Sequence, residues 1–236
     1  MIVSTERPNG VTSPLQDPVF LEQVELIYRK SRMDSARLLG ALPQFVALLL
    51  RRRQVSTAVD PQCLRGALLP AAREMTEFLY ATCIATNSQT VLEYGTSYGA
   101  STLFLGAAAR ELGGRVHSAE VVAEKCVAAR AAVRHAGLQE YVEVHEGDAL
   151  VTLTRTGGAI DLLFLDGWKE LYLPLLKALT PRFRRGTVLV ADNVNFPDAR
   201  DYVAYVQQLQ HGFVSVPIFG GGSLYSVYVG GAGEGM

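Results

Sequence analysis

From residue 90 onward, short apolar runs alternate with longer segments of helical character. The apolar runs cover 90–94, 115–119, 141–145, 160–165 and 187–191. The helical segments between and after them cover 101–112, 122–135, 168–179 and 197–210. Parallel strands need a long crossover connection, which is usually a helix, so this order predicts an α/β fold with a doubly wound parallel sheet.

The two ends of the chain depart from this alternation. Two β-rich runs, 213–219 and 224–229, are separated by Gly220, Gly221 and Gly222, which predicts an antiparallel hairpin and a seven-stranded sheet whose last strand is antiparallel. Residues 1–14 are expected to form a flexible arm. Residues 15–236 are expected to form one domain, with N-terminal helices over 15–88 and the sheet over 89–236.

Composition narrows the class of protein. Hydrophobic residues make up 49% of the chain, which excludes a disordered protein. The net charge of −1 argues against nucleic acid as a partner, although Arg51–Arg53 and Arg182, Arg184 and Arg185 are local basic groups. The three cysteines, Cys63, Cys83 and Cys126, lack a CxxC spacing.

No segment of the sequence predicts export or membrane insertion. The polar N-terminus has no apolar signal region, and the strongest apolar run, 45–50, is too short to cross a bilayer. We therefore expect a soluble cytoplasmic protein.

The first chemical motif is a glycine turn between a strand and a helix. Glu93, Gly95 and Gly99 form the pattern E-x-G-x-x-x-G at the end of the 90–94 run. Gly95 allows a ligand close to the backbone, and an acidic residue before it suits a cationic amino group better than a phosphate. A purely structural turn is the alternative.

Two further carboxylates follow neighbouring strands. Glu120 ends the second predicted strand, where acidic residues bind ribose hydroxyls in nucleoside sites. Asp148, after the third strand, either caps the next helix or lies beside an adenine ring, and the two roles are compatible.

The strongest constellation follows the fourth and fifth strands. Asp166 and Lys169 follow 160–165, and Asp192 and Asn193 follow 187–191. The carboxyl ends of neighbouring parallel strands share one crevice, so three oxygen ligands are expected together. Such ligands suit Mg²⁺ or another divalent cation, and Lys169 can point into the same crevice. The alternative, helix caps beside a surface lysine, would have to occur on two strands at once.

The stretches FLDGWKELYLP and RRGTVLVADNV resemble the metal-dependent O-methyltransferases related to catechol O-methyltransferase, and the resemblance covers about 90–212. It implies a Rossmann-like class I methyltransferase fold, S-adenosylmethionine, Mg²⁺ and a catechol-type small-molecule substrate. Asp166, Asp192 and Asn193 would bind the metal, and Lys169 would be the general base, with Asp166 beside it. A homodimer is expected only from the habit of the family.

The same resemblance distributes the cofactor contacts along the chain. The methionine part would lie on the first turn, the ribose on Glu120, and the adenine between Asp148 and Ala149, after the third strand, and Trp168, after the fourth. The residues implied are Glu93, Gly95, Thr96, Ser97, Gly99, Ser101, Glu120, Asp148, Ala149, Asp166 and Trp168.

Some positions depart from the catechol enzyme. Gly167 replaces a histidine, and the C-terminal glutamate that contacts the second catechol hydroxyl has no clear match near Ile218, whereas Pro197 matches a proline at the pocket mouth. The substrate is therefore less constrained than the reaction. The alternatives are a methyltransferase acting on hydroxylated uridine in tRNA and a non-catalytic protein that binds S-adenosylmethionine.

Overall fold

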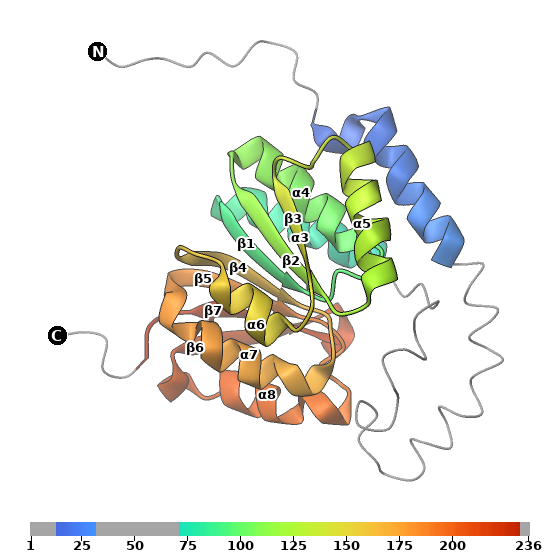
Figure 1. Cartoon of the computed structure of the whole chain (residues 1–236). Coiled ribbons are helices and arrows are strands. Elements are labelled where there is room, and N and C mark those ends of the chain that lie inside the picture. The colour runs from blue at the N-terminus through green and yellow to red at the C-terminus, as the bar shows by residue number, and fades with distance from the viewer. Residues whose placement is uncertain (1–12, 32–70, 232–236) are drawn as a thin grey trace, which may run out of the picture.

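The computed structural model describes residues 13–31 and 71–231. Within these residues a seven-stranded sheet is covered by helices on both faces (Figure 1). The strand order is β3-β2-β1-β4-β5-β7-β6, and β7 runs antiparallel to both of its neighbours. The predicted α/β fold, with its antiparallel last strand, is therefore confirmed. Most of residues 1–14, residues 32–70 of the expected N-terminal helices and, among them, Cys63 lie outside the described residues.

The strands lie close to their predicted positions. Their bounds are β1 Thr90–Tyr94, β2 Arg115–Glu120, β3 Val142–Glu146, β4 Ile160–Leu165, β5 Phe183–Ala191, β6 Phe213–Ile218 and β7 Ser223–Tyr228. All of β4 is buried, as expected for a central strand covered on both faces. The fifth strand begins at Phe183 rather than at Thr187.

Helices on the two faces enclose separate apolar clusters. One face carries the 18–31 helix, α3 (Arg73–Thr86), α4 (Ala100–Leu112) and α5 (Ala123–His135). The other carries α6 (Ala149–Thr152), α7 (Tyr172–Leu179) and α8 (Arg200–Val206) (Figure 1). Short 3₁₀ turns take the place of the ends of two predicted helices: Lys169–Leu171 precedes α7 in the 168–179 segment, and Pro197–Ala199 and Leu209–His211 flank α8 in the 197–210 segment.

The N-terminal helix packs on the same layer as α4. The rings of Phe20 and Phe104 meet edge to face, with centroids 5.3 Å apart, and both side chains are buried. In the part of the chain that the structure describes, no helix is long and apolar enough to cross a membrane.

Candidate active site

Gly95 brings the first and fourth strands together at the carboxyl edge of the sheet. Its φ of +108° lies in the region that side chains disfavour. A Cβ built there would lie 2.6 Å from the carbonyl carbon and oxygen of Asp166. Only glycine lets the turn after β1 lie against the loop after β4, so the first and the strongest predicted motifs are neighbours.

Glu93 is held inside the protein by three hydroxyl groups. Its carboxylate is fully buried and accepts hydrogen bonds of 2.5 Å from Ser101, Thr102 and Ser118. Burial raises the pKa of this carboxyl above its ordinary value. Glu93 therefore stabilises the turn from within in this conformation, and its predicted contact with a cofactor stays a prediction.

Glu120 and Ser97 connect the ends of β1 and β2. The Glu120 carboxylate accepts hydrogen bonds of 2.9 Å from the backbone N–H groups of Ser97 and Val122. Ser97 has a positive φ of 49°, and its Oγ is buried without a hydrogen-bond partner among the described residues. Because buried hydroxyls normally have a partner, this atom fits a site that a polar ligand completes.

Asp166 and Lys169 form a close pair after β4. Lys169 Nζ lies 3.5 Å from Asp166 Oδ1 and donates a 2.8 Å hydrogen bond to the Gly167 carbonyl. Burial raises the pKa of Asp166 from 3.8 to about 7; Lys169 opposes this shift, whereas the charge of Asp192 adds to it. A bound cation would favour the ionised form of this carboxyl.

Asp192 and Asn193 follow the neighbouring strand at the same level. The Asp192 N–H donates a 2.9 Å hydrogen bond to the Leu165 carbonyl, which places it beside the end of β4. Its Oδ1 accepts hydrogen bonds from Ser223 at 2.6 Å and from the Asn193 N–H at 2.9 Å. Its second oxygen makes no hydrogen bond with the described residues and can bind a cation. Asp166, Asp192 and Asn193 together offer two carboxylates and an amide, a set suited to a hard divalent cation.

The residues expected around an adenine ring lie on the α6 side of the sheet. Asp148 caps α6, because its carboxylate accepts a 2.9 Å hydrogen bond from the Leu150 N–H. Ala149 is buried, and Trp168 is partly buried against the same apolar cluster. The capping role predicted for Asp148 is confirmed, and the adenine contacts stay predictions.

Sequence reasoning missed two tyrosines that support this site. The Tyr94 hydroxyl accepts a 3.0 Å hydrogen bond from the Trp168 N–H, and the Tyr172 hydroxyl donates one of 3.1 Å to the Asp192 carbonyl. Lys169 Nζ lies 5.3 Å from the centre of the Tyr172 ring. The sequence feature that could have indicated these tyrosines is Gly167, because a glycine in this motif leaves space that a side chain from elsewhere must fill.

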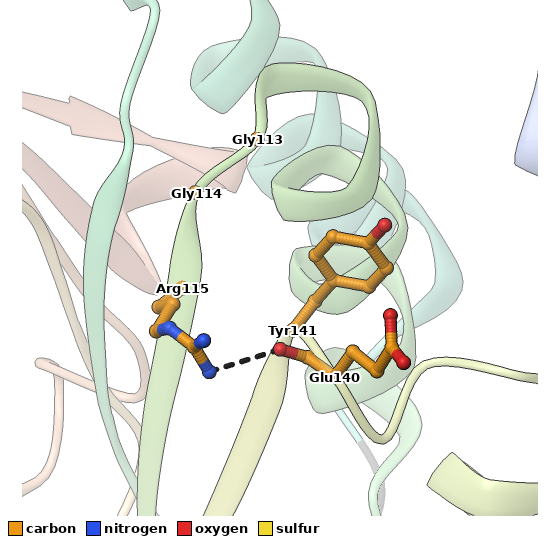
Figure 2. Close-up of a pocket in the computed structure, with 5 residues that line it drawn as sticks. All are labelled: Gly113, Gly114, Arg115, Glu140 and Tyr141. Atoms are coloured by element: carbon orange, nitrogen blue, oxygen red, sulfur yellow. Dashed lines mark hydrogen bonds between the residues drawn. The ribbon is translucent and has the colours of Figure 1, made fainter.

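A pocket of about 410 Å³ lies at the opposite edge of the sheet (Figure 2). It is lined by Gly113, Gly114, Arg115, Glu140 and Tyr141, at the amino ends of β2 and β3. Arg115 already donates a 3.0 Å hydrogen bond to the Glu140 carbonyl. None of the predicted site residues lines this pocket.

The chain resembles known proteins in sequence. The profile of a methyltransferase domain matches residues 92–194. Catechol O-methyltransferase B of Danio rerio is 33% identical over 210 residues, which is 84% of this chain and 77% of that protein. A catechol O-methyltransferase of Mycobacterium tuberculosis is 39% identical over 119 residues, which is 50% of this chain and 54% of that protein.

Solved structures show the same fold. Cofactor-bound Rv0187 from MTB is 29% identical with a TM-score of 0.60, and the match covers 68% of this chain and 82% of that one. An O-methyltransferase from Bacillus cereus, solved in complex with SAH, is 24% identical with a TM-score of 0.60, over 80% of this chain and 97% of that one.

Proposed function

Since the chain belongs to the catechol O-methyltransferase family and is an S-adenosylmethionine-dependent O-methyltransferase, we propose that it methylates one hydroxyl of a catechol-like small molecule, with Mg²⁺ bound and Lys169 as the base. The observation that carries the proposal is the convergence of Asp166, Lys169 and Asp192 at the ends of two adjacent strands. The metal and the base go beyond what family membership alone establishes.

The donor set fits a divalent cation. Asp166, Asp192 and Asn193 would hold it through oxygen atoms, and the raised pKa of Asp166 reflects buried negative charge that a cation would compensate. When bound, the cation supplies electrostatic stabilisation of the oxyanion that forms as the substrate hydroxyl loses its proton. The same charge would hold the two hydroxyls of a catechol against the site.

Lys169 would receive that proton. Its Nζ is tethered by the Gly167 carbonyl and lies beside Asp166 and the Tyr172 ring, so it has little freedom to move. In the reaction, the substrate oxygen gives its proton to the neutral amine of Lys169 and forms a bond to the methyl carbon. The carbon–sulfur bond breaks, and its electron pair leaves with the sulfur of S-adenosylhomocysteine. Positioning and charge placement then account for most of the acceleration.

The cofactor site is proposed to follow the first turn and the second strand. The methionine part would be surrounded by Gly95, Thr96, Ser97, Gly99 and Ser101. The Ser97 hydroxyl, which has no hydrogen-bond partner among the described residues, would contact it directly. The Glu120 carboxylate would accept hydrogen bonds from the ribose hydroxyls as well as from the Ser97 backbone N–H. Asp148, Ala149 and Trp168 would border the adenine.

Among the residues that the structure describes, no observation favours the tRNA alternative. Arg182 donates to the carbonyls of Leu153, Gly157 and Gly158, and Arg184 pairs with Asp161, so these cations serve the fold. Arg185 donates to the Val229 carbonyl. Arg51–Arg53 lie outside the described residues.

The deciding experiment is methyl transfer from labelled S-adenosylmethionine to catechols, hydroxycinnamates and tRNA, with Mg²⁺ and with EDTA. We expect a catechol to be methylated only with Mg²⁺. Asp192→Asn should abolish this activity, while Asp201→Asn, at an exposed position on α8, should keep it. Full activity in EDTA would contradict the metal requirement, and methylation of tRNA alone would contradict the substrate class.

A further inference from the structure

We propose that His117, Glu143 and His145 form a second metal site, selective for a transition-metal dication such as Zn²⁺ and separate from the catalytic edge. The three residues lie on β2 and β3, at the edge of the sheet opposite to β6. None of them belongs to the methyltransferase site proposed above.

The register of the two strands places all three side chains on one face. His117 is paired with Glu143 in the parallel ladder, and His145 follows Glu143 by two residues, so their side chains point to the same side. Their neighbours in the strands, Val116 and Val144, point to the other face and join the cluster beneath α4 and α5.

The possible ligand atoms are spaced as a metal would require. His117 Nδ1 lies 3.1 Å from His145 Nε2 and 3.4 Å from Glu143 Oε2. All three residues offer ligand atoms within 4.8 Å of one another. Ligands at about 2.0–2.1 Å from a tetrahedral Zn²⁺ are separated by about 3.3–3.4 Å, so small movements suffice.

The two histidines are largely buried, whereas the carboxylate is exposed, so a metal ion can reach the site from solvent. The side chains of His117 and His145 are 17% and 19% exposed, whereas Glu143 is 64% exposed and can swing inward. Burial and the neighbouring His145 lower the pKa of His117, and a neutral imidazole is the form that binds metal. Arg115 and Arg182 oppose a cation here, and the Glu143 carboxylate offsets part of their charge.

This site and the catalytic edge offer different types of ligand, so they prefer different metals. Two imidazoles and one carboxylate favour Zn²⁺, Ni²⁺ or Cu²⁺ over Mg²⁺, whereas two carboxylates and an amide favour the harder ion. Three protein ligands also leave a coordination position for water. One chain would therefore hold two different cations without exchange between the sites.

The test is isothermal titration calorimetry with Zn²⁺ in saturating Mg²⁺. It uses the whole chain without a tag, after treatment with a chelator. Binding of Co²⁺, followed by its visible absorption, reports the geometry. We expect one Zn²⁺ per chain at this site, and a loss of affinity of about 100-fold or more in His117→Gln and His145→Gln. His135→Gln, at an exposed position on α5, should bind normally, as should Asp192→Asn.

Thermal unfolding adds a second readout that does not depend on activity. Zn²⁺ should raise the melting temperature of the unsubstituted protein and of His135→Gln but not of His145→Gln, because a ligand stabilises the state that binds it. Equal melting temperatures in EDTA would show that His145→Gln folds. Zn²⁺ binding that is absent, or unchanged in both histidine variants, would overturn the proposal and leave only a hydrogen bond between the two imidazole rings.

Discussion

The ring of Tyr94 lies where a side chain at Gly167 would begin. A Cβ built on Gly167 would lie no more than 2.6 Å from three atoms of that ring. The same ring meets Tyr172 edge to face, and its hydroxyl accepts from the Trp168 N–H. The two positions therefore form one unit, in which Tyr94 supports the loop that carries Asp166 and Lys169.

This relationship predicts that Gly167→Ala destabilises the protein and that Tyr94→Ala relieves the damage. Overpacking should cost about 1–3 kcal/mol of unfolding free energy in the single variant. In the double variant, the added methyl group should cost less, which a double-mutant cycle from urea denaturation would measure. Gly157→Ala is the matched control, because nothing lies within 4 Å of the Cβ position there. Additive effects of the two substitutions would disprove the coupling.

Lys169→Met should remove most of the turnover and leave cofactor affinity unchanged. Loss of a positioned base typically costs about 10²–10⁴-fold in rate. Lys177→Met is a close control: each lysine lies over a tyrosine ring, Lys177 at 5.2 Å from Tyr205 and Lys169 at 5.3 Å from Tyr172. Single-turnover methyl transfer and calorimetry with S-adenosylmethionine would check both quantities. Equal rates in the two variants would exclude Lys169 as the base.

The sequence predicted the elements well because apolar runs such as Ile160–Leu165 leave no alternative to a central strand. It also predicted that Asp166 and Asp192 would be neighbours, since strand topology determines this. It could not predict that three hydroxyls enclose Glu93, because these contacts depend on how α4 and β2 pack. The Tyr94–Gly167 contact was equally hidden, since the two residues are far apart along the chain.

Glu93→Gln should destabilise the protein and weaken cofactor binding together. The carboxylate accepts from three hydroxyls, whereas an amide nitrogen can only donate, so at least one hydroxyl in this fully buried place must give up its donor role and reorient. The expected cost is about 1–3 kcal/mol. Glu22→Gln, at an exposed position, should change neither quantity. Chemical denaturation and calorimetry would measure both, and an unchanged unfolding free energy would show that the hydroxyls reorganise without cost.

The raised pKa of Asp166 predicts how the stability of the metal-free protein depends on pH. Because burial raises this pKa from 3.8 to about 7, the protonated carboxyl is tolerated in the folded protein at low pH. Between pH 4 and pH 7 the unfolded chain loses this proton more readily than the folded one, so the contribution of Asp166 to stability falls as pH rises. Above pH 7 the carboxyl of Asp166 is ionised and buried in the folded protein, so its contribution to stability stays at its lowest value.

Asp166→Asn isolates this effect, because asparagine does not titrate. The unfolding free energy of the variant minus that of the unsubstituted protein should therefore increase from pH 4 to pH 8, and parallel curves would contradict a raised pKa. Mg²⁺ should reverse the trend in the unsubstituted protein alone, because it binds the ionised carboxylate and releases a proton. Denaturation at several pH values, with EDTA and with Mg²⁺, therefore tests the burial of Asp166 and its role as a ligand separately.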